Sequence, residues 1–334
     1  MTEPWFAAAA IAAALSTGLQ EAEPSAPQET APDAVPAMPS TPDPIRENAE
    51  TYAAYHADVG EAGRRPLLSG ADLDATMDAL AQYYDGDRLV DAQIAYAALV
   101  AAQHPEFIDA VRAVADYYGT ETARAALTND PVYVTGFMGA DVALASVVGA
   151  LEEDAQSIRG VGDRYRQEAY SLQNETWAAR RARDREDRLA ALETASERLD
   201  VQFRLAPEAG QTESGTPTRL GAASALGDNR PPTGVPALPE LSVTVGEQQL
   251  EPDERRVGRM LAVAALQSIE DGDMTTLDRM LAEPSVERCI NWARLTMAQC
   301  VAAGHFKYED SFCIAEHALM DVADCLTATR PVSN

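Results

Sequence analysis

The chain has 334 residues, which is enough for two modest domains. It carries 53 acidic and 26 basic side chains, for a net charge of −27. Such a charge repels nucleic-acid phosphates and anionic lipid headgroups, so we expect neither as a partner. Aromatic residues make up only 6% of the chain and alanine is abundant. This composition favours an all-α protein with helices packed through small side chains.

Residues 5–15 form an apolar run that is too short to cross a bilayer. The run resembles the core of a secretory signal, although Glu3 stands where such signals carry a basic residue. We therefore expect residues 1–20 to be a signal-like segment of an exported protein, periplasmic or secreted, with no membrane span in the mature chain. An uncleaved anchor and a plain alanine-rich helix are the alternatives. Residues 21–46 are rich in proline and acidic side chains and predict a disordered tether.

Residues 47–205 show helical periodicity and predict a helical domain. Leu73, Met77 and Leu80, for example, recur at the spacing of one helix face. The apolar residues 131–151 predict a buried central helix. Residues 152–203 are long and charged, with apolar side chains at three- and four-residue steps. We expect a single long helix there, with a solvated part that pairs with a protein partner or with a second copy.

Residues 206–252 are rich in glycine and proline and predict a linker with one short strand-like segment at residues 241–245. Helical patterns resume after it. We expect residues 253–330 to form a second, smaller helical domain that contains all the cysteines.

The cysteines lie in two predicted helices that flank the turn GHFKYED. Two cysteines eleven residues apart in one helix are separated by roughly 16 Å, whereas a disulfide needs Cα atoms within about 7 Å. Neither helix can therefore bridge its own pair, and the short turn makes the helices antiparallel. We predict a disulfide-linked hairpin with the pairs Cys289–Cys325 and Cys300–Cys313.

One spacing conflicts with regular helix geometry. At about 100° per residue, Cys313 and Cys325 fall about 120° apart, so we expect the second helix to fray, bend or overwind before Cys325. The layout resembles the twin-cysteine hairpins of coiled-coil-helix proteins, with longer spacing between the cysteines. That resemblance implies the architecture alone.

A zinc site is the alternative for the same stretch. Cys300, His305, Cys313 and His317 supply two sulfur and two nitrogen ligands, a set that zinc binds tetrahedrally. That site would leave Cys289 and Cys325 without a role, and we favour the disulfides. We expect no cofactor.

The chain has no nucleophile elbow, phosphate-binding loop, HExxH or CxxC motif. We therefore expect an exported, envelope-associated protein of scaffold or partner-binding type, and lean against an enzyme. The alternative is a periplasmic hydrolase of cell-wall or peptide substrates, with its site between the helices of residues 71–151. A concave pocket with a histidine and two carboxylates would favour that alternative.

Overall fold

The computed structural model describes residues 43–84, 87–182, 185–197, 203, 205, 250–269 and 274–331. The signal-like segment, nearly all of the predicted tether and most of the predicted linker, with its strand-like residues 241–245, lie outside the described residues. The described residues all belong to one compact unit.

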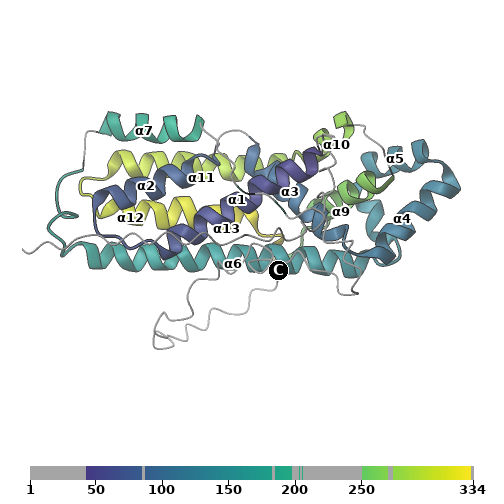
Figure 1. Cartoon of the computed structure of the whole chain (residues 1–334), viewed down its shortest axis with the longest axis horizontal. Coiled ribbons are helices and arrows are strands. Elements are labelled where there is room, and N and C mark those ends of the chain that lie inside the picture. The colour runs from purple at the N-terminus through teal and green to yellow at the C-terminus, as the bar shows by residue number, and fades with distance from the viewer. Residues whose placement is uncertain are drawn as a thin grey trace, which may run out of the picture. The chain divides into compact units, whose positions relative to one another are not determined.

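The described residues are almost entirely helical, so the all-α prediction is confirmed (Figure 1). In chain order the elements are α1 (Pro44–Arg64), α2 (Gly70–Ala81), α3 (Arg88–Ala101), α4 (Pro105–Tyr118), α5 (Thr120–Asn129), η1 (Pro131–Gly136), α6 (Ala140–Leu172), α7 (Arg185–Glu197), β1 (Leu250–Pro252), α9 (Glu254–Ile269), α10 (Met274–Leu281), α11 (Pro284–Ala303), α12 (Glu309–Cys313), η2 (Ile314–Met320), α13 (Asp321–Leu326) and β2 (Thr329–Pro331).

The first helix begins inside the predicted tether. The Asp43 carboxylate accepts hydrogen bonds from the amides of Ile45 and Arg46 at 3.1 and 3.3 Å. Pro44 occupies the first helical position, where a missing N–H costs nothing. The sequence Asp-Pro is thus the start signal of α1, and the helical body begins three residues before the expected boundary at residue 47.

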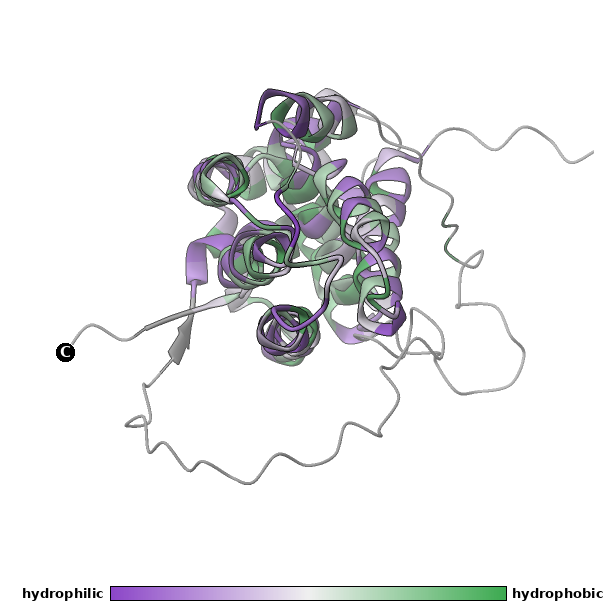
Figure 2. Cartoon of the chain, turned by 90° about the vertical axis from the view of Figure 1, so that its left-hand side faces the viewer, coloured by the Kyte–Doolittle hydropathy of each residue, from purple (hydrophilic) through white to green (hydrophobic). Residues whose placement is uncertain are grey.

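The core is continuous across residues of the two expected helical domains. Eleven of the 14 residues of α3 are buried, so this helix needs neighbours on nearly every side. It packs against α1 and α6 from the first expected domain and against α9 from the second. One cluster of buried side chains includes residues of both. Seen from the end, the helices turn hydrophobic residues toward one another and hydrophilic ones outward (Figure 2).

The described part of residues 152–203, which we expected to be one long charged helix, belongs to two helices. α6 begins earlier than expected, at Ala140, and ends at Leu172, and α7 is a separate helix. Between them the backbone pairs with the turn of the cysteine hairpin. The amide of Ala182 donates to the His305 carbonyl at 3.0 Å, and the amide of Tyr308 donates to the Ala178 carbonyl at 3.1 Å. A helix through this segment would join the Ala178 carbonyl to the Ala182 amide, so the contacts with the turn are incompatible with a continuous helix here.

The apolar residues 131–151, expected as one buried helix, are also divided. η1 is a short 3₁₀ turn, and α6 starts after Gly139, whose φ of 74° lies in the left-handed region. A Cβ at this position would lie 2.8 Å from the amide nitrogen of Phe107 in α4. Glycine therefore permits both the turn and the close approach of α4.

One short strand precedes α9 and a second follows α13. β1 and β2 pair antiparallel, with Leu250 opposite Pro331. β1 forms the last three residues of the predicted linker, so the end of that segment is fixed beside the C-terminal hairpin. None of the described helices is long and apolar enough to cross a membrane.

Candidate functional site

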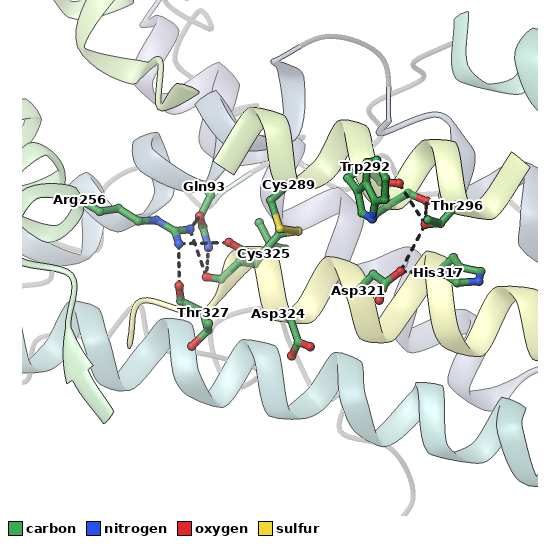
Figure 3. The surroundings of a disulfide bond; sticks show 12 residues. Gln93, Arg256, Cys289, Trp292, Thr296, His317, Asp321, Asp324, Cys325 and Thr327 are labelled. Carbon is green, nitrogen blue, oxygen red and sulfur yellow. Dashed lines mark hydrogen bonds and ion pairs between the residues drawn. A yellow bond between two sulfur atoms is a disulfide. The ribbon is translucent and has the colours of Figure 1, made fainter. Parts of the chain in front are cut away.

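The two disulfides of the C-terminal hairpin are those that we predicted from helix geometry. Cys289 and Cys325 join α11 to α13 with their Cα atoms 5.6 Å apart (Figure 3). Cys300 and Cys313 join α11 to α12 beside the turn, with their Cα atoms 5.7 Å apart. All four cysteines are oxidised. The sulfur atoms that a zinc site would use are thus covalently bonded to each other.

The second arm of the hairpin contains a π-helical segment, η2, between α12 and α13. Within it the amide of Asp321 donates to the carbonyl of Glu316, five residues earlier. A π segment is an α-helix with one extra residue accommodated as a local bulge. The buried hydroxyl of Tyr84 donates to the carbonyl of Ala318 in this segment at 3.0 Å.

The π segment resolves the conflict in cysteine spacing. Eleven residues make about three turns of α-helix, which keeps Cys289 and Cys300 on one stripe of α11. Cys325 lies twelve positions after Cys313, and the π-helical turn of η2 accommodates the additional residue. We expected the helix to fray, bend or overwind before Cys325. It is instead locally underwound in η2.

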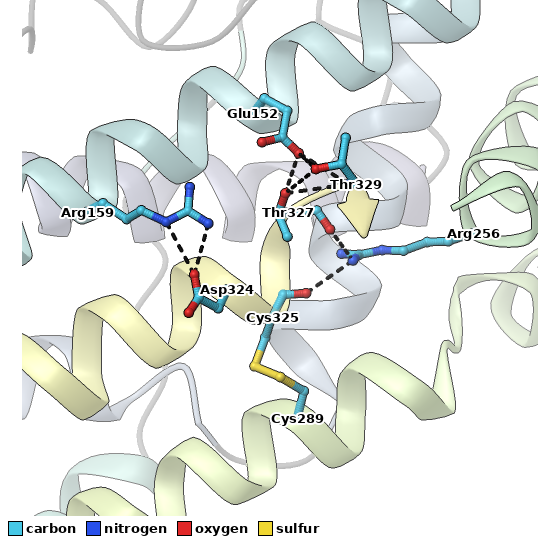
Figure 4. Close-up of polar contacts among 8 residues, drawn as sticks. All are labelled: Glu152, Arg159, Arg256, Cys289, Asp324, Cys325, Thr327 and Thr329. Atoms are coloured by element: carbon cyan, nitrogen blue, oxygen red, sulfur yellow. Dashed lines mark hydrogen bonds and ion pairs between the residues drawn. A yellow bond between two sulfur atoms is a disulfide. The ribbon is translucent and has the colours of Figure 1, made fainter. Parts of the chain in front are cut away.

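A buried arginine fixes the end of this arm. Arg256 of α9 donates to the carbonyls of Cys325 and Thr327 at 3.1 and 2.6 Å (Figures 3 and 4). Its guanidinium also contacts the amide oxygen of Gln93, whose nitrogen donates to the Leu326 carbonyl at 2.6 Å. The cation thus binds carbonyl groups that a helix end leaves unpaired. α9 and α3 are thereby tied to the hairpin.

Two contacts join the same arm to α6. The Glu152 carboxylate accepts from the Thr329 hydroxyl at 2.8 Å and also contacts the Thr327 hydroxyl (Figure 4). Arg159 pairs with Asp324 at 2.9 Å on the surface. The exposed pair adds little to stability, whereas the carboxylate bonds hold the chain as it leaves α13.

The two histidines of the zinc alternative have other roles. His305 is exposed in the turn, where its amide donates to the Glu309 carboxylate and its carbonyl accepts from Ala182. The His317 ring lies 2.8 Å from the Asp321 carboxylate, four residues further along the chain. We find no group of three or more potential metal ligands among the described residues.

A histidine of α1 packs against tyrosines in the core instead. Tyr52 and His56 of α1 have ring centroids 4.5 Å apart, and Tyr52 lies 4.9 Å from Tyr96 of α3. Asp154 of α6 is 1% exposed and interacts with Tyr52 and Tyr96. Burial raises the pKa of Asp154 to about 7 and lowers the pKa of His56 to about 3. Both groups are therefore neutral over part of the acidic range.

This buried cluster is a feature of the core in this structure, not an accessible reaction site. His56 is 8% exposed and the two tyrosines are fully buried, so a substrate would have to open the helices to reach them. Sequence reasoning missed the cluster because Asp154 and His56 are far apart in the chain. The available signal was that Asp154 shares a helix face with Leu151, Ala155 and Ile158, all of which are apolar.

An apolar cavity of about 210 Å³ opens between α4, α5 and η1. We call it the aromatic cleft. Its main lining residues are Val111, Val114, Tyr118, Leu127, Tyr133 and Phe137. Three further apolar side chains of the same stretch of chain are exposed, namely Tyr117, Met138 and Val142. The cleft lies within residues 71–151, where we expected the site of the alternative hydrolase. No histidine or carboxylate among the described residues lines it.

A second cavity of about 330 Å³ lies beside the hairpin turn. Tyr170, Phe312 and the Cys300–Cys313 disulfide contribute to its walls, together with Glu309. The Glu309 carboxylate accepts from the amides of His305 and Phe306 and thus stabilises the turn. Its position is explained by folding, so it gives no support for an acid–base role.

Comparisons of the chain with protein-family models, curated proteins and solved structures gave no match in any of the three.

Proposed function

We propose that this protein is exported to the cell envelope and binds a partner protein through the aromatic cleft, without catalysing a reaction of its own. The single observation that carries the proposal is the cleft, an open apolar concavity with aromatic walls on an otherwise strongly acidic molecule. Contiguous exposed apolar surface of this kind is typical of interaction sites.

The distribution of exposed apolar side chains favours this surface over residues 152–203, where we had expected the partner to bind. Tyr117, Tyr118, Tyr133, Met138 and Val142 gather within one stretch of the chain, with exposed fractions between 47% and 81%. Among the described part of residues 152–203, Tyr170 is the one large apolar side chain exposed to this degree. Most apolar residues of α6 face the core.

The size of the cleft also favours protein binding. Pockets for cofactors and drug-sized ligands typically enclose about 300–1,000 Å³, and the aromatic cleft has about 210 Å³. An anchoring side chain of a partner is a better fit than a small-molecule substrate. Interfaces commonly place such an anchor at their centre, surrounded by tyrosines.

The two disulfides support the proposed compartment. Such bonds form and persist in the periplasm and outside the cell, and are rare in a reducing cytoplasm. The signal-like residues 1–20 point to the same compartment.

The proposal is tested by photocrosslinking in the native host. A benzophenone side chain is placed at Tyr118 in the cleft and, as a control, at the exposed Tyr170 outside it. We expect one discrete protein adduct from position 118 and none of the same mass from position 170. No adduct specific to position 118 would contradict the proposal.

The identified partner is then purified and tested against two matched variants. Ala126→Phe fills the cleft, which Ala126 lines, whereas Ala125→Phe adds the same ring at the exposed neighbouring position. We expect Ala126→Phe to weaken binding about tenfold or more and Ala125→Phe to leave it unchanged. Equal binding by the two variants would rule out the cleft as the docking site.

A further inference from the structure

The segment of the chain that forms the aromatic cleft is acidic. Residues 105–142, which form α4, α5, η1 and the start of α6, contain six acidic and two basic side chains. Both basic residues are paired with acids of their own helices, Arg112 with Asp109 at 3.8 Å and Arg124 with Glu121. Neither arginine is therefore poised to attract an anionic partner.

The remaining acids of this region are exposed. They are Glu106, Asp116, Asp130 and Asp141. Glu106 lies beside Gly139 at the turn between η1 and α6, on the same part of the molecule as Met138. Asp130 also accepts from the amide of Val132 at 3.2 Å and so sits at the start of η1. The apolar cleft is thus formed by a segment of net negative charge.

The tyrosines of the cleft suit a cationic neighbour. The rings of Tyr117 and Tyr118 meet edge to face with centroids 4.7 Å apart, and those of Tyr133 and Phe137 do so at 5.2 Å. Tyr117 is 81% exposed. Edge-to-face packing leaves ring faces available, and the face of a tyrosine attracts the ammonium or guanidinium group of a lysine or arginine.

The same charges disfavour the other occupants. A second copy of the chain would bring a net charge of −27 and an identical acidic segment against this one. Anionic lipid headgroups would meet the same repulsion. A basic segment would instead gain from attraction during encounter and from burial of its apolar residues in the cleft.

We propose that the aromatic cleft binds a cationic amphipathic segment of its partner protein. An apolar side chain of that segment enters the space between α4, α5 and η1, and flanking lysine or arginine side chains cover the exposed tyrosine rings. The mode is that of a helix whose apolar ridge enters a groove. This inference rests on the proposed function and specifies the chemistry of the partner.

The test uses two synthetic helical peptides with the same leucine face. One carries lysine and arginine on its polar face, and the other carries glutamate in their place. Binding to the purified full chain is measured by calorimetry at about 0.05 M and about 0.5 M salt. We expect the cationic peptide to bind and the anionic peptide to bind at least tenfold more weakly at low salt, with the difference shrinking at high salt because ions screen exposed charges.

Three variants separate the cleft from the general acidity of the molecule. Tyr118→Ala/Tyr133→Ala should weaken the cationic peptide about tenfold, and Glu106→Gln/Asp141→Asn should weaken it about threefold at low salt only. The control Glu168→Gln/Glu175→Gln removes the same charge from the α6 end and the loop after it, and should leave binding unchanged. Circular dichroism confirms that each variant is folded.

Each outcome decides for or against the inference. Equal loss with the control pair would mean that the peptide binds the acidic surface without using the cleft. Equal binding of the two peptides would rule out the charge preference, as would binding to phosphatidylcholine–phosphatidylglycerol vesicles in place of the peptide. If the crosslinked partner docks in the cleft through an acidic or neutral segment, this inference fails and the proposed function stands. If no partner reaches the cleft, both fail.

Discussion

Two regions of the molecule differ in how they are stabilised. One is the hairpin arm formed by α12, η2 and α13, and the other is the hairpin formed by α4 and α5. Eleven of the 18 residues in the first are buried, against six of the 24 in the second. Two disulfides and the Arg256 contacts fix the first. The second packs mainly on α9 and η1, at the other end of the view in Figure 1. We conclude that stability is concentrated in one region and accessible apolar surface in the other.

This division has a physical reason. A binding surface must leave apolar side chains in water, so it cannot use them to stabilise its own helices. The continuous core connects the two regions, because α9 packs against α3 and also against α4 and α5. The predictions that follow test the contrast, beginning with the largest expected effect.

Removal of a disulfide should cause the largest loss. In the chain-entropy account the Cys289–Cys325 bond, which closes 36 residues, contributes about 4 kcal/mol, and the Cys300–Cys313 bond, which closes 13, contributes about 3 kcal/mol. We expect urea unfolding of Cys289→Ala/Cys325→Ala and of Cys300→Ala/Cys313→Ala to show these losses in that order. Losses below about 1 kcal/mol for both would mean that the clamp is not the source of stability.

Asp154 lies in the core that joins the two regions. Its ionisation should make the free energy of unfolding depend on pH. Its pKa is raised from 3.8 to about 7, so the folded protein keeps a proton that the unfolded chain releases in this interval. The free energy of unfolding therefore falls as the pH rises from about 4 to about 7. His56 acts in the opposite sense, because its pKa is lowered from 6.5 to about 3.

The effect of Asp154 is isolated by comparing Asp154→Asn with the wild type, since His56 is common to both. We expect the stability difference, variant minus wild type, to increase by about 3 kcal/mol between pH 4 and pH 8. Denaturant unfolding across this range measures it. A difference that does not change with pH would show that Asp154 is not protonated in the folded protein.

Deletion of one residue should distinguish the two arms of the cysteine hairpin. Removing His317 places Cys313 and Cys325 eleven positions apart, which a regular α-helix accommodates, so we expect both disulfides and a loss of only about 1 kcal/mol. Removing Gln299 from α11 rotates Cys300 by about 100° relative to Cys289, and one disulfide should not form. Intact-mass analysis and thiol titration give the number of disulfides. Equal behaviour of the two deletions would contradict the role of η2.

The smallest effect should come from the exposed side of the α4–α5 region. Tyr117→Ala removes a ring that is 81% exposed and should change the free energy of unfolding by no more than about 0.5 kcal/mol. Hydrogen exchange should be faster for amides of α4 and α5 than for those of α12 and α13, because local opening exposes fewer buried contacts. Comparable protection of the amides from exchange in the two regions would contradict the expected difference in local stability.

The sequence alone determined the features that depend on local geometry. The lengths of two helices and the short turn between them left one pairing of four cysteines, because a disulfide has a fixed reach. Helix periodicity determined the fold class, and the start of α1 was encoded in Asp43 and Pro44, although we placed it three residues late. These features require no knowledge of distant neighbours.

Tertiary structure decided the rest. The sequence pattern alone allows α3 and α9 to belong to separate domains. In the structure both helices are buried on most of their sides, so each needs several neighbouring helices. The segment after α6 hydrogen-bonds to the hairpin turn instead of continuing as a helix, and that turn is more than 100 residues away in sequence. The underwound turn in η2 and the burial of Asp154 beside Tyr52 and Tyr96 depend likewise on which helices pack together. Packing brings distant residues into contact, and neither periodicity nor spacing records those contacts.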